Sequence, residues 1–104
     1  MRPTFLPPAD RFALLLDAHK LAYVREYKFH PIRKWRADFK VGLTLLVEVE
    51  GGVWSFGRHT RGVGFENDCQ KYAAAMMLGF RVLRITPKHI DNGEALGWVR
   101  ALLP

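Results

Sequence analysis

Hydrophobic positions in the first part of the chain change from a helical to a strand spacing. After prolines at positions 7 and 8, apolar residues and one histidine recur three, four and seven positions apart: Phe12, Leu15, Leu16 and His19. This spacing predicts an amphipathic helix. Over 22–29, aromatic, β-branched and charged residues mix, which predicts a strand that ends at His30-Pro31 because proline cannot donate to a ladder.

Two further strands occupy the middle of the chain. Residues 35–40, WRADFK, and 43–50, LTLLVEVE, both have strand composition, and the second has the strongest strand signal in the sequence. The turn between them, around Val41-Gly42, is short enough to join antiparallel neighbours. We therefore predict a hairpin.

The second half of the chain begins with a glycine-rich segment. Residues 51–65, GGVWSFGRHTRGVGF, contain five glycines without sustained periodicity, which predicts a loop. A helix is predicted next, up to Gly79, with an apolar face formed by Phe65, Cys69, Tyr72, Ala73 and Met76. Residues 80–86, FRVLRIT, predict a buried strand ended by Pro87, and 94–103 predict a short final helix.

The resulting order is α-β-β-β-α-β-α. The third strand, the second helix and the fourth strand form a βαβ unit, whose right-handed crossover makes these strands parallel. The predicted fold class is therefore α/β, with a mixed β-sheet flanked by helices. The length of 104 residues suits a single domain, with residues 1–8 as an extended N-terminal segment.

Composition narrows the class of protein. Hydrophobic residues make up 49% of the chain and charged residues 25%, as in soluble globular proteins. No apolar run approaches the roughly 18 residues that span a membrane, and no signal peptide is apparent, so we expect no membrane partner and a cytoplasmic location. The single cysteine, Cys69, excludes an internal disulfide and is predicted to be a small core residue.

The charge is basic and unevenly distributed. Sixteen Lys and Arg against ten Asp and Glu give a net charge of +6. Six of the bases lie within 25–40, where the acids are Glu26 and Asp38: Arg25, Lys28, Arg33, Lys34, Arg36 and Lys40. This favours nucleic acid as a partner, with Arg33, Lys34 and Arg36 as contacts, over the alternative of a solvated basic surface.

The third predicted strand places two acids on one face. With a period of two, Glu48 and Glu50 project together, roughly 6.5–7 Å apart. If the hairpin loop spans 41–45, Asp38 lies almost opposite Glu48. Three converging carboxylates suit a hard divalent ion such as Mg²⁺, which supports phosphodiester hydrolysis. The alternative is that Glu48 and Glu50 pair with arginines of neighbouring strands, such as Arg36, Arg81 or Arg84.

These residues resemble a known family. RKWRADF, LLVEVEGG and DCQKYAAAMMLGFRVLRIT, within residues 23–86, are similar to the PD-(D/E)xK nuclease superfamily, and more narrowly to small endonuclease-like domains related to very-short-patch repair endonucleases. The resemblance implies a restriction-endonuclease-like core and a Mg²⁺- or Mn²⁺-dependent DNA endonuclease. Since such domains are common in bacterial and phage genomes, it also implies the cytoplasm of a bacterial or phage-infected cell.

The same resemblance implies roles for individual residues. Asp38 matches the metal-binding aspartate, and Glu48 the first acid of the triplet, also a metal ligand. Glu50 stands where the family usually has lysine, giving an E-x-E variant in which Glu50 either binds metal or acts as general base. Lys71 is the candidate for a lysine that has moved to the helix; the alternative is an exposed helix lysine.

The glycine-rich loop offers groups that suit phosphate. Arg58 and Arg61 are predicted DNA contacts, and His59 is either a general acid or base or a phosphate contact. Trp35 and Trp54, which flank the acids in sequence, either stack on bases or close the edge of a core.

We thus predict a structure-selective DNA endonuclease acting on a junction, flap, mismatch or nick. Paired cuts would call for a homodimer. One alternative is a catalytically inactive nucleic-acid-binding module of the same fold, and another is an interaction protein without DNA or metal.

Overall fold

The computed structural model describes residues 6–51 and 62–104. Its helices and strands follow the order α1 (Pro8–Ala18), β1 (Tyr23–Lys28), β2 (Arg36–Val41), β3 (Leu45–Val49), α3 (Val63–Met77), β4 (Arg81–Ile85), α4 (Pro87–Asp91) and α5 (Glu94–Leu102). Every predicted helix and strand is present within a few residues of its expected bounds. No helix in the described ranges is long and apolar enough to cross a membrane.

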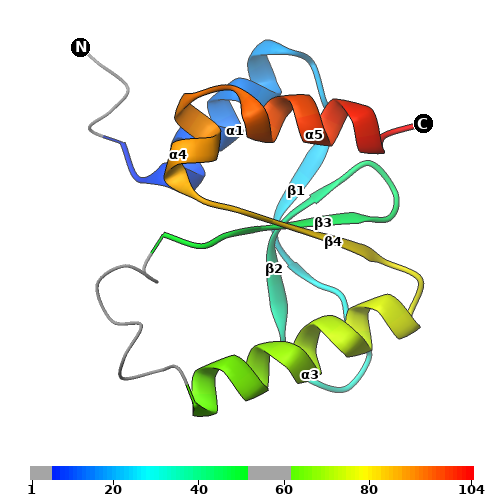
Figure 1. The fold of residues 1–104 in the computed structure, drawn as a ribbon. Coiled ribbons are helices and arrows are strands. Elements are labelled where there is room, and N and C mark those ends of the chain that lie inside the picture. Colours follow the sequence, from blue (N-terminus) through cyan, green and yellow to red (C-terminus); the bar gives the residue numbers. More distant parts are fainter. Residues whose placement is uncertain (1–5, 52–61) are drawn as a thin grey trace.

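The four strands form one mixed sheet in the order β1-β2-β3-β4. The pairs β1–β2 and β2–β3 are antiparallel, whereas β3 and β4 are parallel, as the βαβ unit requires. Helices α1, α4 and α5 cover one face of the sheet and α3 lies along the other (Figure 1). The predicted fold class, a mixed sheet flanked by helices, is confirmed.

The short helix α4 was not predicted. Pro87 ends β4, as expected, but it also occupies the first turn of α4, where the missing N–H costs nothing. Thr86 and His89 cap this helix, because the Thr86 N–H donates to His89 Nδ1 at 3.0 Å and the Thr86 hydroxyl accepts from the His89 N–H at 3.5 Å. The strand before it is an edge strand, in which Ile85 alone is buried, so the expectation of a buried strand was wrong.

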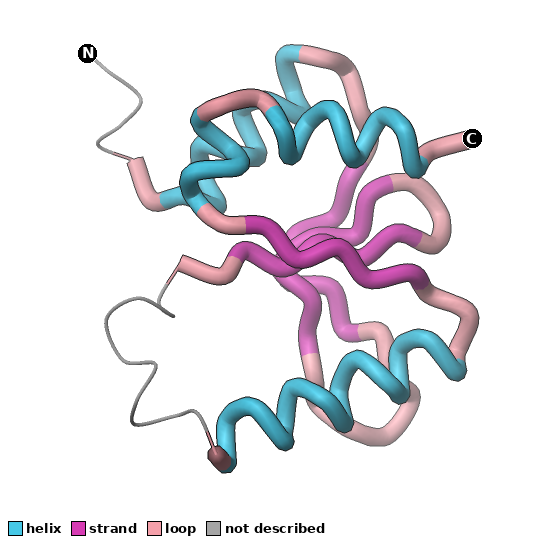
Figure 2. The backbone as a smooth tube through the Cα atoms, in the orientation of Figure 1, coloured by secondary structure: helices cyan, strands magenta, loops and turns pink. Residues whose placement is uncertain are grey.

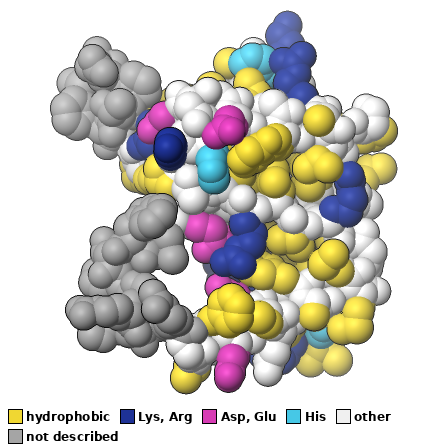
Figure 3. All heavy atoms as spheres, in the orientation of Figure 1, with side chains coloured by type: hydrophobic (Ala, Val, Ile, Leu, Met, Phe, Trp, Pro, Cys, Tyr) yellow, Lys and Arg dark blue, Asp and Glu magenta, His cyan; other side chains and the backbone are white. Residues whose placement is uncertain are grey.

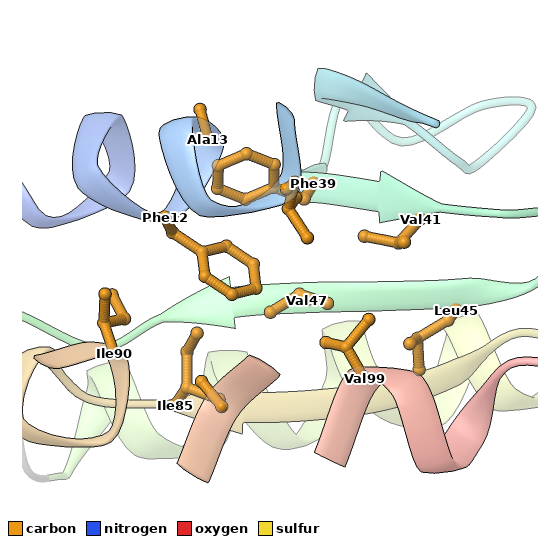
Figure 4. Close-up of a cluster of buried hydrophobic side chains, with 11 residues drawn as sticks. Phe12, Ala13, Phe39, Val41, Leu45, Val47, Ile85, Ile90 and Val99 are labelled. Carbon is orange, nitrogen blue, oxygen red and sulfur yellow. The ribbon is translucent and has the colours of Figure 1, made fainter. Parts of the chain in front are cut away.

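The main core fills the space between the sheet and the three helices on its first face (Figure 4). Its largest fully buried side chains are Phe12, Leu16, Phe39, Val41, Leu45, Val47, Ile85 and Val99. The rings of Phe12 and Phe39 meet edge to face with centroids 5.1 Å apart. Leu45 and Val47 of β3 belong to this core, so the predicted alternation leaves Glu48 on the opposite face.

A smaller core lies beneath α3, which among the described residues is the helix on this side of the sheet (Figure 2). Its buried members are Phe29, Ala37, Leu46 and Ala75, with Trp35 and Phe80 packed against them. The ring of Trp35 stacks on Phe29 with centroids 6.2 Å apart. Trp35 therefore closes the edge of a core, the second of the two roles considered for it.

The orientation of α3 differs from the prediction. Phe65 and Met76, expected in the core, are 57% and 62% exposed, and Cys69 is exposed as well. The side chains nearer the sheet are instead Asp68, Lys71, Tyr72 and Ala75, at a spacing of three, four and seven. The reason is that this face of the sheet carries acids, so it pairs with a helix face that offers an ammonium and a hydroxyl.

Candidate active site

The hairpin brings Asp38 and Glu48 together. Phe39 pairs with Val47, so the antiparallel register places Asp38 opposite Glu48, as predicted. The Val49 backbone N–H donates to Asp38 Oδ2 at 2.7 Å and holds that carboxylate across the two strands. Glu48 is only 7% exposed. Both acids occupy the sheet face that α3 covers.

Lys71 of α3 reaches this pair. Its Nζ lies 3.0 Å from Glu48 Oε2, and the two side chains are only 16% and 10% exposed. Lys71 is thus no exposed helix lysine, and the alternative considered for it was wrong. A positive charge therefore lies at the acidic centre, contributed by α3.

Burial disfavours the charged form of both carboxylates. Burial raises the pKa of Glu48 to about 7, and the neighbouring acids Asp38 and Glu50 add to the rise, while Lys71 opposes it. The pKa of Asp38 is also raised by burial, against the hydrogen bond from Val49 that lowers it. A further cation beside them would stabilise the charged form of both carboxylates.

Glu50 belongs to a separate ion-pair cluster. Arg84 Nε lies 3.0 Å from Glu50 Oε2, and the Tyr72 hydroxyl donates to the same oxygen at 3.3 Å. The Arg84 guanidinium also lies 3.7 Å from Asp68 and 4.9 Å from the centre of the Tyr72 ring. Pairing with an arginine, the alternative considered for both acids, is thus correct for Glu50 and wrong for Glu48. Acidic and basic side chains adjoin near the middle of the view in Figure 3.

The Tyr72 hydroxyl stays protonated in this cluster. Burial raises its pKa, and Glu48, Glu50 and Asp68 raise it further. The hydrogen bond with Glu50 raises the pKa of Arg84. The apolar spacing of the helix predicted an apolar environment for Tyr72, whereas the helical spacing that Tyr72 shares with Asp68 and Lys71 places it on the polar face.

Glu26 is a further neighbour that sequence analysis missed. The pairs Arg25–Phe39 and Tyr27–Ala37 bracket Glu26 and Asp38, which therefore face each other across β1 and β2. Glu26 adopts a left-handed backbone conformation, with φ of 51°, and its charge raises the pKa of Asp38. Only the pairing of β1 with β2, which was not predicted, brings Glu26 to Asp38.

The acids do not assemble into a ready metal centre. In residues 6–51 and 62–104, no group of three His, Cys, Asp or Glu side chains is placed to hold an ion. The predicted cluster of three is incomplete because Arg84 engages Glu50. Asp38 and Glu48 remain, and two carboxylates are enough for Mg²⁺, which keeps several waters and takes substrate phosphate oxygens. The raised pKa values of Asp38 and Glu48 are consistent with such an ion, because a bound cation would stabilise the carboxylates that burial disfavours.

The predicted DNA contacts fall into two groups. Arg33, Lys34 and Arg36 belong to the end of the β1–β2 hairpin and are exposed; Arg33 stacks over Trp35 at 3.9 Å, and Arg36 lies 3.7 Å from Glu26. Trp54, Arg58, His59 and Arg61 lie outside the described residues.

Comparison with known proteins supports the fold. No protein-family model and no curated protein matches the chain. The structure is similar to the catalytic domain of the homing endonuclease I-Bth0305I, with a TM-score of 0.62 and 21% sequence identity, over 92% of this chain and 97% of that one. The likeness shows a shared nuclease-like fold.

Proposed function

We propose that the protein is a metal-dependent DNA endonuclease. The observation that carries this proposal is the arrangement of Lys71 and Asp38, both half-buried, around buried Glu48 on the sheet face under α3. An ammonium beside two carboxylates is a combination that suits phosphodiester hydrolysis. The similar fold of a homing endonuclease catalytic domain supports the same reaction class.

The proposed roles divide between these residues. Asp38 and Glu48 would hold Mg²⁺ or Mn²⁺, which when bound polarises a phosphoryl oxygen and makes water a better nucleophile. Lys71 would stabilise the negative charge that develops on the phosphoryl oxygens. Its partner Glu48 keeps the ammonium in place, 3.0 Å away, before substrate arrives.

In this proposal Glu50 positions neighbouring side chains. Its carboxylate accepts from both Arg84 and Tyr72, so it orients the ion-pair cluster beside the two metal ligands. For Glu50, a role as metal ligand or as general base stays a proposal. For His59, a role as general acid or base, or as a phosphate contact, stays a proposal as well.

The positive charge of the protein is the reason for proposing DNA as its substrate. The net charge of +6 and the basic end of the β1–β2 hairpin suit a polyanion, and Arg58 and Arg61 would add contacts from the glycine-rich segment. A chain this small offers little surface to read a long sequence, which favours recognition of a junction, flap, mismatch or nick. Cleavage of both strands would use a homodimer.

A panel of branched, mismatched, nicked and plain duplexes, incubated with Mg²⁺, Mn²⁺ or EDTA, tests the proposal. We expect cleavage with either metal and none with EDTA. Asp38→Asn should abolish it, whereas Glu94→Gln, at the start of α5 on the other side of the sheet, should not. Metal-independent cleavage would contradict the assignment of Asp38.

The second candidate is a DNA-binding module without chemistry. It is favoured by one observation: Arg84 holds Glu50, and the described residues offer no group of three metal-binding side chains. Salt-dependent binding of DNA, with no cleavage in any arm of the panel, would select this candidate.

A further inference from the structure

β4 forms one edge of the sheet. It pairs with β3, and in residues 6–51 and 62–104 no strand pairs with its other side (Figure 1). An edge strand offers its outward N–H and C=O groups to another chain, unless a proline or an irregular backbone interrupts it. At the opposite edge, Glu26 of β1 has a left-handed conformation, with φ of 51°, whereas β4 has no proline and no such residue. β4 is therefore the edge suited to pairing.

The hydrogen bonds to β3 show which backbone groups of β4 point outward. The Arg81 N–H donates to the Thr44 carbonyl at 2.8 Å, and the Ile85 carbonyl accepts at 2.7 Å from the residue that follows β3. Backbone groups alternate in direction along a strand, so positions of the same parity as Arg81 and Ile85 face β3. The N–H and C=O groups of Val82 and Arg84 therefore face the free edge.

The open stretch of this edge is short and bounded. The next outward positions on either side are Phe80 and Thr86, whose N–H groups already donate to α3 and to α4, each at 3.0 Å. An antiparallel copy of the stretch fits it about a twofold axis at Leu83. Val82 of each copy then exchanges two backbone hydrogen bonds with Arg84 of the other, which satisfies both outward residues in both chains.

The side chains at this axis are compatible with such a pair. Arg84 would lie near its own copy, but its guanidinium is 3.0 Å from Glu50 and 3.7 Å from Asp68 of the same chain, so its charge is compensated before the chains meet. On the other face of β4, half-buried Leu83 would lie directly opposite Leu83 of the second copy. The axis thus joins an apolar pair and brings no uncompensated like charges together.

α3 exposes an apolar face beside the same edge. Phe65, Cys69 and Met76 are exposed and share the helical spacing of Tyr72. The Tyr72 ring lies 4.9 Å from the Arg84 guanidinium of β4, so this face of α3 points toward the β4 edge. The twofold axis of an antiparallel strand pair is perpendicular to the sheet, which puts both α3 helices on one face of it with their apolar faces toward each other. A second copy accounts for both the open edge and the exposed apolar face.

We propose that the β4 edge and the apolar face of α3 form the interface of a symmetric homodimer, in which two sheets join into one. Both acidic centres then lie on the same face of the joined sheet. Glu48 of β3 is separated from its copy by three strand spacings, or about 14 Å across the strands. Two centres so placed suit cleavage of both strands of one duplex, a consequence that rests on the proposed function, whereas the interface itself does not.

Sedimentation equilibrium of the full chain over a concentration series tests the interface. Wild-type protein should approach twice the monomer mass. Val82→Pro removes an outward N–H that the ladder with β3 does not use, and proline is tolerated at such edge positions, so this variant should keep its circular dichroism and fall twofold in mass. Val82→Thr keeps the N–H and the β-branched shape and is the matched control, which should stay dimeric.

Cysteine cross-linking tests the register even if Val82→Pro fails to fold. In a Cys69→Ser background, Leu83→Cys would face its own copy with Cα atoms about 4.5–5.5 Å apart, within the range that a disulfide spans. Arg81→Cys, two residues earlier on the same strand, would lie more than about 13 Å from its copy. Mild oxidation should link the Leu83→Cys protein into dimers and leave the Arg81→Cys protein unlinked.

The outcomes separate the interface from the endonuclease. A monomeric wild-type protein would overturn the interface and leave the β4 edge to an extended segment of another protein. Dimeric Val82→Pro, or equal cross-linking of the two cysteine variants, would assign the dimer to another surface. A wild-type dimer that cleaves no DNA would overturn the proposed function and leave the interface standing. If both hold, Val82→Pro should nick one strand where wild-type protein cuts both.

Discussion

Lys71 Nζ and Glu48 Oε2 lie 3.0 Å apart between α3 and β3, in side chains that are only 16% and 10% exposed. A buried ion pair costs much of its attraction in lost hydration, so it seldom stabilises a fold as well as apolar packing would. Its presence here, beside Asp38, agrees with the catalytic role proposed for this face of the sheet.

Loss of the ammonium should affect both stability and turnover. Lys71→Met keeps the aliphatic stem but leaves Glu48 buried without its partner, which should lower the free energy of unfolding by about 3 kcal/mol at pH 8. Denaturant unfolding measures this. Adding Glu48→Gln should recover most of the loss, since position 48 then carries no charge that needs a partner; no recovery in the double variant would contradict the pairing as the cause.

The kinetics of Lys71→Met test its proposed role. DNA affinity should change little, whereas the cleavage rate should fall strongly, because the interaction is made with charge that develops in the transition state. Lys40→Met, at a cation on the β2 strand beyond Asp38, is the control. Full activity of Lys71→Met would remove Lys71 from the catalytic centre.

Asp38→Asn and Glu48→Gln should each abolish cleavage with nearly unchanged volume. Calorimetric titration with Mn²⁺ gives a readout apart from activity, since each variant should lose heat of binding that the wild-type protein shows. Circular dichroism should show an intact fold in both. Wild-type metal affinity in either variant would contradict the assignment of that ligand.

The raised pKa of Glu48 predicts a pH dependence of stability. The folded protein holds the Glu48 proton up to about pH 7, whereas the unfolded chain releases it near the ordinary value of 4.5. The contribution of Glu48 to stability should therefore fall as pH rises from about 4.5 to about 7, and level off above that. Thermal melts of wild-type protein and Glu48→Gln across this range measure it; equal slopes would contradict the raised pKa.

The ion pair of Glu50 with Arg84 predicts that position 50 does not tolerate lysine. Glu50→Lys would place an ammonium against the Arg84 guanidinium, now 3.0 Å from the carboxylate, and should lower the melting temperature without raising activity. Glu50→Gln keeps the shape and should lower the cleavage rate by at least about 10²-fold only if Glu50 is a general base. A more active Glu50→Lys would contradict the expected repulsion between position 50 and Arg84.

Sequence alone determined the hairpin and which residues of its second strand share a face. The alternation of apolar and acidic residues in 43–50 has a period of two, so Glu48 lies away from the core that contains Leu45 and Val47. The pairing of Asp38 with Glu48 followed from the sequence only on the condition that the loop spans 41–45, and the observed pairing of Phe39 with Val47 meets it. The alternation is a local property, so the chain pattern was sufficient for it.

Only the tertiary structure decided how α3 is rotated and which acid each cation meets. Apolar spacing favoured Phe65 and Met76 as the inner face, but the sheet offers acids there, and Lys71 and Tyr72 turn toward them instead. Likewise Arg84 was one of several possible partners for Glu50 until the parallel pairing of β3 and β4 brought them side by side. Contacts between distant segments depend on how two whole surfaces match, and no local period carries that information.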